Sequence, residues 1–175
     1  MRYTLATYLR AALYFTCYGV VKYLPPPIGD AARYLVLKLF VKQIQSWKIK
    51  DGVTLWFPEG VSIGRHVTIN EGVFMDGFGG LTISDHCRIA HGCSFISEDH
   101  VFGDRTKPIW QQGKRAGAIV LEEDVWCGCG VKVMSGVTIG KGSVIAAGAI
   151  VTRDIPPYSI AMGVPARVVG MRGQP

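Results

Sequence analysis

Several features that would place a chain in a common class of protein are missing from these 175 residues. The amino terminus carries no secretory signal with a small-residue cleavage site. The most apolar run, residues 11–21, is too short to span a bilayer. No long lysine and arginine run with interleaved aromatic residues occurs, which argues against nucleic acid as a partner. These absences favour a cytoplasmic protein.

Cysteine is present but is not organised for disulfides or for metal. The five cysteines are an odd number, and we expect reduced thiols at Cys17, Cys87, Cys93, Cys127 and Cys129. The spacing Cys127-x-Cys129 would suit a metal only with a second pair of ligands at similar spacing, and the sequence has none. We therefore expect no metal requirement.

Glycine and positive charge are the two components in excess. The chain has 22 glycines, roughly twice the average usage, and a net charge of +6. A basic chain favours anionic partners such as phosphorylated ligands or an anionic membrane face. Residues 1–50 are apolar and basic with few glycines, whereas residues 51–170 are glycine-rich and periodic. We therefore expect an N-terminal segment and a separate repeat domain.

The glycine-rich part repeats every six residues. From Leu121 an apolar residue opens each hexad and a small or apolar residue returns at its fifth position, in LEEDVW, CGCGVK, VMSGVT, IGKGSV, IAAGAI and VTRDIP. The same frame is found upstream from Phe57 and, after an eight-residue unit at Met75–Thr82, again from Ile83. A period of six suits a strand and a turn repeated three times per coil, with the opening residue inside and glycine at the corners. Stacked coils then bury one continuous core, which predicts a parallel β-helix.

The six-residue frame is lost once, between His100 and Ile119. Residues 101–118 are predicted to form a loop that leaves the coil. Loops of this length in a compact repeat are usually functional, although a tolerated surface insertion is the alternative.

The N-terminal segment contains two predicted helices. The first covers about Leu5–Tyr23 and ends before the prolines at 25–27, and the second starts at Asp30 as its N-cap and runs to about Ile44. Both helices are apolar with a basic edge. Residues 1–45 are therefore expected either to contact a membrane surface peripherally or to pack on the β-helix or another subunit.

Two strings carry a resemblance to a known family: TISDHCRIAHGCSFISEDH and IVLEEDVWCGCGVKVMSGVTIGKGSVIAAGAIVTRDIPPYSIAMGVPARVVG. They resemble the hexapeptide-repeat acyltransferases. From Thr82 to Val169 the likeness is to the galactoside and maltose O-acetyltransferase branch and its polysaccharide O-acetyltransferase relatives. The resemblance implies an all-β, left-handed parallel β-helix with an N-terminal helical segment. It also implies a homotrimer that binds acetyl-CoA in clefts between subunits.

The function implied by the resemblance is acetyl-CoA-dependent O-acetyl transfer. The expected acceptor is a hydroxyl of a saccharide or of a glycan-assembly intermediate in polysaccharide biosynthesis, at the cytoplasmic face of the membrane. N-acetylation of an amino sugar would use the same donor and the same base. The thioester is already activated, so this chemistry needs no metal.

The resemblance further implies the site residues. His100 matches the histidine that acts as general base, and a histidine, with an ordinary pKa of about 6.5, suits that task at neutral pH. The residues that match the acetyl-CoA cleft are Trp126, Cys129, Ala147, Thr152, Arg153 and Arg167. Among them the arginines can bind the phosphates of CoA. The candidates for the acceptor pocket are Asn70, Asp76 and Asp99, and either Asp99 or Glu98 could instead orient the histidine.

Two other interpretations are open at this point. The γ-class carbonic anhydrases share the fold and hold a metal with three histidines, for which His66, His86 and His91 are candidates. The hexad phase of His86 and His91 is one residue away from the anhydrase motif, which turns the side chains to the other face of a strand. The third interpretation is a non-catalytic hexapeptide-repeat scaffold, and the joint presence of His100 and the CoA-end residues argues against it.

Overall fold

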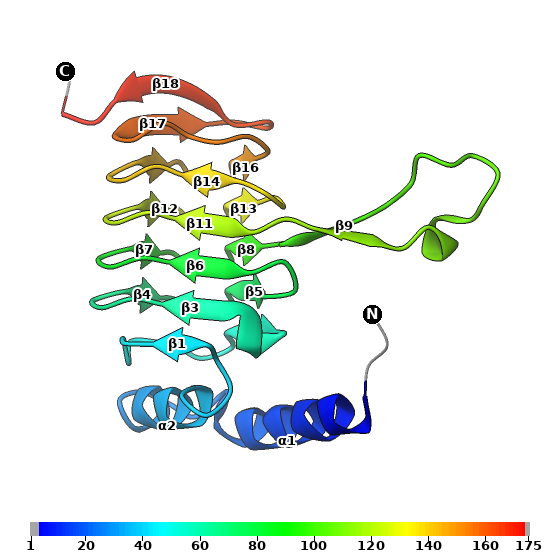
Figure 1. The fold of residues 1–175 in the computed structure, drawn as a ribbon. Coiled ribbons are helices and arrows are strands. Elements are labelled where there is room, and N and C mark those ends of the chain that lie inside the picture. The colour runs from blue at the N-terminus through cyan, green and yellow to red at the C-terminus, as the bar shows by residue number, and fades with distance from the viewer. Residues whose placement is uncertain (1–3, 174–175) are drawn as a thin grey trace.

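The computed structural model describes residues 4–173. Two helices, α1 (Leu5–Val21) and α2 (Ile28–Leu37), precede a column of short strands. The helices lie at one end of this column and β18 lies at the other, while one hairpin projects from the side (Figure 1). No helix among the described residues has the length and the apolar character needed to cross a bilayer.

The strands form three sheets, which are the three faces of each coil. Sheet A contains β1 (Gln43–Ile44), β3 (Val61–Ile63), β6 (Leu81–Ile83), β11 (Ile119–Leu121) and β14 (Thr138–Ile139). Sheet B contains β4 (Thr68–Ile69), β7 (Arg88–Ile89), β12 (Trp126–Cys127), β15 (Val144–Ile145), β17 (Ser159–Met162) and β18 (Arg167–Met171). Sheet C contains β2 (Thr54–Trp56), β5 (Phe74–Asp76), β8 (Ser94–Phe95), β13 (Lys132–Val133) and β16 (Ile150–Val151). Within these sheets only the β17–β18 pair is antiparallel.

The strand register confirms the six-residue repeat. Ile63 pairs with Ile83, Ile83 with Leu121, and Leu121 with Ile139, so equivalent hexads stack directly. Each hexad-opening residue from Leu121 to Val151 is buried, and so is each fifth-position residue from Val125 to Ile155. The core is therefore one column that every coil extends, as in other repeat proteins.

The corners of the coils account for the glycine content. At the corner between sheets B and C, Gly72, Gly92, Gly130 and Gly148 have left-handed φ angles of 66° to 72°, which glycine adopts without a Cβ clash. Elsewhere glycine is needed for space. A Cβ atom on Gly77 would lie 2.2 Å from the carbonyl oxygen of Phe57 in the coil below.

The corner between sheets C and A, called here the C–A corner, is longer than six residues allow. Phe57 does not open an inward hexad, because it is only half-buried and has a left-handed φ of 51°. The prediction that the frame begins at Phe57 is therefore wrong. Residues 55–62 form an eight-residue unit that stacks on the unit at 75–82, since Leu55 pairs with Met75. One coil later the same corner opens into the projecting hairpin.

The second helix differs from its prediction. It runs from Ile28 to Leu37 with Pro27 as the N-cap residue, rather than from Asp30 to Ile44. Residues 43–44 form strand β1 because their backbone pairs with β3. The carboxylate of Asp30 caps no helix; its two oxygens each lie 2.6 Å from a cation, one on Arg33 and one on Lys50.

Arg33 joins the two helices to the first coil. Its side chain is fully buried, and its guanidinium donates to the carbonyl oxygens of Val21 and Leu24 and to that of Ile49. It also pairs with the buried Asp30. A buried guanidinium is stable only when it is paired in this way. The contact therefore fixes where the helical segment sits on the open end of the β-helix.

Two buried tyrosines attach α1 to the same coil. The hydroxyl of Tyr14 donates to the carbonyl oxygen of Leu55 at 3.3 Å, and that of Tyr18 donates to Val53 at 3.1 Å. Burial raises the pKa of both phenols far above the ordinary value, so both remain neutral donors.

Replacement of Arg33 tests this anchor. We expect Arg33→Met to lower the free energy of unfolding by about 3–5 kcal/mol, because Asp30 and several carbonyl oxygens lose their buried partner. Urea unfolding measures the loss, and Lys48→Met, which removes an exposed cation, is the control and should change stability by less than about 0.5 kcal/mol. Equal unfolding midpoints for the two variants would contradict the assignment.

Candidate active site

The projecting hairpin carries the predicted general base. It consists of β9 (Glu98–His100) and β10 (Lys114–Ala116), and His100 lies opposite Lys114. The imidazole of His100 is exposed and makes no hydrogen bond or ion pair within residues 4–173. It is therefore open to the hydroxyl of a bound acceptor, as a general base must be.

Alternation along β9 decides which carboxylate shares a face with His100. Residues two apart in a strand point to the same side, so Glu98 lies on the face of His100 and Asp99 on the opposite face. Asp99 faces Arg115, with 3.6 Å between Oδ2 and Nη2. Of the two acids that could orient the histidine, only Glu98 is on its side of the hairpin.

Glu98 occupies a partly enclosed position at the base of the hairpin. Its Oε1 forms an ion pair with the ammonium of Lys114, and that ammonium lies 5.6 Å from the centre of the Phe78 ring. Its Oε2 is buried and has no hydrogen-bond partner among the described residues. A buried acceptor without a partner is costly, which makes this oxygen a candidate contact for a substrate hydroxyl.

The segment beyond the hairpin is an ordered arm. Gln112 joins its two sides, since its side chain accepts from the amide of Asp104 at 2.9 Å and donates to the carbonyl of the same residue at 2.8 Å. The hydroxyl and amide of Thr106 donate to the Asp104 carboxylate, and together with Lys107 they lower its pKa. A short 3₁₀ turn (Ile109–Gln111) completes the arm, whose exposed apolar side chains are Val101, Phe102, Ile109 and Trp110.

The return strand of the hairpin holds cations that the sequence reading missed. Lys114 and Arg115 face Glu98 and Asp99 across the hairpin. The sequence does contain a sign of this pairing, because the acidic string EDH before the loop and the basic string KRA after it are complementary in charge. The hairpin begins at Glu98, before the predicted loop of residues 101–118, and its two strands are paired, which brings these cations opposite the two acids.

The three acceptor candidates do not meet within this chain. Asp76 is buried at the C–A corner below the hairpin, where its carboxylate accepts from the amide and hydroxyl of Ser97 and from the amide of Phe78. It therefore supports the corner. Asp99 lies on the hairpin itself, whereas Asn70 follows β4 at the corner between sheets B and C.

The six donor candidates fall into two groups. Trp126 is half-exposed on β12, and Cys129 and Ala147 occupy successive coils at the B–C corner, where the amide of Gly148 donates to the carbonyl of Cys129 at 2.8 Å. The backbone amide of Ala166 donates to the carbonyl oxygen of Ile150, which lies just beyond that corner. Arg167 is the next residue and therefore belongs to the same group. The second group, Thr152 and Arg153, is exposed at the C–A corner, two coils beyond the hairpin.

The three histidines of the anhydrase interpretation are spread over two corners. The rings of His66 and His86 stack with their centroids 5.1 Å apart at the corner between sheets A and B, and both residues have left-handed φ angles. His91 lies at the next corner, after β7. Within residues 4–173 no cluster of three or more His, Cys, Asp or Glu side chains is arranged to hold a metal ion.

Similarity to known proteins decides between the interpretations. Residues 118–153 match the bacterial transferase hexapeptide family, described as six repeats. A protein of Staphylococcus aureus (strain COL) named as an acetyltransferase is 43% identical over 147 residues, which cover 82% of this chain and 71% of that protein. The chain belongs to the hexapeptide-repeat acetyltransferases. It spans a smaller share, 38%, of a protein of Mycobacterium tuberculosis (strain ATCC 25618 / H37Rv) that is also named as an acetyltransferase, to which it is 38% identical over 119 residues.

Solved structures place the same acetyltransferase fold over nearly the whole chain. A hexapeptide-repeat-containing acetyltransferase of Vibrio cholerae O1 biovar eltor, complexed with acetyl coenzyme A, has a TM-score of 0.86 at 27% identity and covers 98% of this chain and 91% of its own. A galactoside acetyltransferase in complex with coenzyme A has a TM-score of 0.85 at 26% identity, with coverage of 98% and 84%. The expected left-handed β-helix, the acyltransferase class and the acetyl-CoA donor are confirmed at the level of this family.

The thiols of this acetyltransferase provide a test of the donor cleft. Burial raises the pKa of the Cys87 and Cys93 thiols to about 11, and that of Cys127 well above its ordinary value. Thiolate forms at these three positions only when the pH approaches the raised pKa, so they should resist alkylation at pH 8. Cys17 and Cys129 are half-buried and should react.

Iodoacetamide labelling with and without coenzyme A separates the two reactive thiols. If Cys129 lies in the cleft, CoA should slow its labelling by about the factor 1 + [CoA]/Kd and leave Cys17 unchanged. Mass spectrometry of the labelled peptides provides both rates. Labelling of Cys129 at the same rate with saturating CoA would remove it from the cleft.

Proposed function

We propose that this chain transfers an acetyl group from acetyl-CoA to a hydroxyl of a saccharide, with His100 as the general base. The observation that carries the proposal is the exposed imidazole of His100, which has no partner among the described residues and lies at the outer end of strand β9. The chain also belongs to a family in which solved structures contain bound acetyl-CoA or CoA.

The chemistry needs one proton acceptor that becomes a proton donor. The imidazole takes the proton of the acceptor hydroxyl as the oxygen attacks the thioester carbonyl. The tetrahedral oxyanion is stabilised by a hydrogen-bond donor, for which a backbone amide suffices. When the intermediate collapses, the C–S bond breaks and the imidazolium returns the proton to the CoA thiolate. Glu98, on the same face of the hairpin, is the carboxylate proposed to orient the imidazole.

The donor site is proposed to lie between subunits of a homotrimer. Its candidate residues occupy two separate corners of one protomer, with Trp126, Cys129, Ala147 and Arg167 near one and Thr152 and Arg153 at the other. A cleft that needs both groups is completed when one corner of a protomer meets the other corner of its neighbour. Arg153 and Arg167 are both exposed and would bind the CoA phosphates.

A saccharide is the proposed acceptor class because a neighbouring structure is a galactoside acetyltransferase. The hydroxyl groups of the saccharide are proposed to contact Asp99 on the hairpin, the unpartnered oxygen of Glu98, and Asn70 from an adjacent protomer. Asp76 would act indirectly, by holding the corner from which the hairpin leaves. A role in polysaccharide biosynthesis is the corresponding physiological proposal.

Replacement of His100 tests the catalytic assignment. We expect His100→Asn to lower kcat about 10²–10⁴-fold, because the hydroxyl loses its proton acceptor, while CoA binding stays unchanged. Release of free CoA thiol with a panel of sugars and glycan intermediates measures turnover, and calorimetry measures CoA binding.

His66→Asn is the matched control for this experiment, because asparagine tolerates the left-handed φ of that residue. It should keep normal transfer. Full activity in His100→Asn would refute the general-base role, and CoA binding without transfer to any acceptor in the unmodified protein would favour the scaffold interpretation.

We also propose that the helical end of the molecule contacts an anionic membrane surface. Residues 1–50 hold eight lysines and arginines against one acidic residue, Asp30, which is buried and ion-paired. The outward side of α1 and α2 is apolar and exposed at Leu5, Leu9, Leu13, Val20, Ile28 and Leu35. A basic edge around an apolar helical face suits the interface of a bilayer with anionic lipids. Because acetyl-CoA is the donor, the proposed location is the cytoplasmic face.

Vesicle sedimentation tests this contact. We expect the double variant Leu9→Glu/Leu13→Glu to bind phosphatidylglycerol-containing vesicles at least about tenfold more weakly, since it places carboxylates in the apolar face. Val168→Glu/Val169→Glu, which alters exposed residues at the opposite end of the β-helix, should bind as the unmodified protein does. Equal binding by both double variants, or binding that added salt does not weaken, would reject the proposal.

A further inference from the structure

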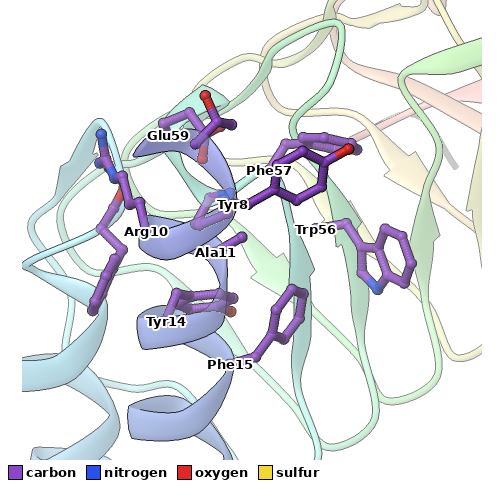
Figure 2. A pocket seen from close by; sticks show the side chains of 11 residues that line it. Tyr8, Arg10, Ala11, Tyr14, Phe15, Trp56, Phe57 and Glu59 are labelled. Carbon is purple, nitrogen blue, oxygen red and sulfur yellow. The ribbon is translucent and has the colours of Figure 1, made fainter. Parts of the chain in front are cut away.

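An apolar cavity lies between α1 and the first extended corner of the β-helix. Its volume is about 240 Å³. Figure 2 shows Ala11, Tyr14 and Phe15 on the helix side of the cavity, and Trp56 and Phe57 on the side of the β-helix. Ala11 leaves the space open, because its methyl group stands where a larger side chain would meet the aromatic rings.

The walls of this cavity present carbon rather than polar groups. The hydroxyl of Tyr14 is engaged with the carbonyl of Leu55, so only its ring contributes to the wall. Phe15 and Trp56 are about half-exposed, at 49% and 51%, although both are large and apolar. Such an exposed aromatic rim around an apolar hollow is typical of a binding site.

The charged groups of the cavity occupy its exposed edge. Arg10 and Glu59 both line it and both are exposed, and the guanidinium of Arg10 donates to the carbonyl of Phe40 at 3.2 Å. An apolar interior with a cation and an anion at its edge matches an amphiphile, whose chain is buried and whose polar head stays in water. The volume is below that of most drug-sized sites, so the cavity would hold one segment of a chain.

A continuous row of aromatic rings connects this cavity with the hairpin. The centroid of Trp56 lies 6.2 Å from that of Phe15 and 6.4 Å from that of Phe57. Phe57 in turn contacts Phe78 one coil above, at 5.3 Å.

The row of rings ends beside the candidate base. The ammonium of Lys114 lies over the Phe78 ring, and Lys114 is the cross-strand partner of His100. The corner that lines the cavity and the corner that bears the hairpin are two coils apart, which is about 10 Å along the stack. A saccharide head could therefore reach His100 while an attached chain occupies the cavity.

We propose that this cavity binds the hydrocarbon chain of a lipid-linked saccharide acceptor. The proposal rests on the acetyl transfer proposed above and names the class of its acceptor. Helix α1 takes part in both proposed contacts. It lines the cavity with Ala11 and Phe15, and it exposes Leu9 and Leu13 on the side where the membrane surface is proposed to lie. A chain that leaves the bilayer beside α1 would enter the cavity directly.

Calorimetry with the full chain tests the cavity without an acceptor in hand. The probes are farnesyl phosphate and dodecyl phosphate, each below its micelle concentration, with inorganic phosphate as the third arm. We expect saturable binding of one chain per protomer. A preference between the two lipids distinguishes a prenyl chain from a saturated alkyl chain, while inorganic phosphate should neither bind nor compete.

Two alanine-to-tryptophan substitutions on α1 provide a test variant and its matched control. Ala11→Trp fills the cavity and should weaken chain binding at least about tenfold, whereas Ala6→Trp, at an exposed position of the same helix, should leave it unchanged. Phe15→Ser, at the exposed rim, is a milder second variant that should also weaken binding. Circular dichroism and urea unfolding establish that each variant is folded.

The outcomes separate this proposal from the proposed function. No saturable binding by the unmodified protein, or equal binding by the variants at residues 11 and 6, would overturn the chain site. Competition by inorganic phosphate would overturn it too, because the anion rather than the chain would then be recognised. His100→Asn should retain farnesyl phosphate binding, so a failed general base and a failed chain site give different results.

Discussion

The structure depends on the hydrogen bonds between successive coils at a fixed register. Each strand pairs with the strand one coil below, so the residue that points inward in one coil must do so in the next. An extra residue inside a strand would turn its apolar side chains outward. Additional residues can therefore be accepted only at corners, and this chain adds them at one corner in three consecutive coils.

This restriction explains why the candidate site lies where it does. The C–A corner grows from an eight-residue unit at 55–62 and another at 75–82 into the hairpin that bears His100. The extra length brings aromatic side chains out of the coil at Phe57 and Phe78, and these form the row of rings beside the hairpin. The buried Asp76–Ser97 contact holds the base of the corner, so the hairpin leaves from a rigid platform.

The open end of the first coil is a second constraint, because unpaired strand edges must be covered. Helices α1 and α2 cover it, and the buried Arg33 and the two tyrosines of α1 satisfy the backbone carbonyls found there. The helices bury one side only. Their other side stays apolar and basic, and the space left beside Ala11 becomes the cavity. Capping, the proposed membrane contact and the proposed chain site thus arise from a single short segment.

Periodicity was enough to predict the architecture. Most hexads from Ile83 onward, and the burial of their first and fifth residues, could be read directly, because period six has few structural solutions. The chain leaves the coil earlier than the predicted break after His100, because Glu98–His100 already form the first strand of the hairpin and Asp99 is not buried. Two further predictions failed where the local pattern was ambiguous. Phe57 is apolar and stands six residues before Ile63, yet it lies at an extended corner, and residues 43–44 have a helical pattern but pair with β3.

The sequence by itself therefore determined the repeat, the core and the position of the loop, because these depend on contacts between residues at fixed spacing. Only the tertiary structure decided which candidate residues share a corner, that Glu98 rather than Asp99 shares the face of His100, and that α1 leaves a cavity beside Trp56. The face of His100 follows from the pairing of β9 with β10, whereas the shared corners and the cavity join residues from different coils and from the helical cap. Their distances follow from how the coils stack and from how Arg33 seats the helices, and neither is encoded in a local pattern.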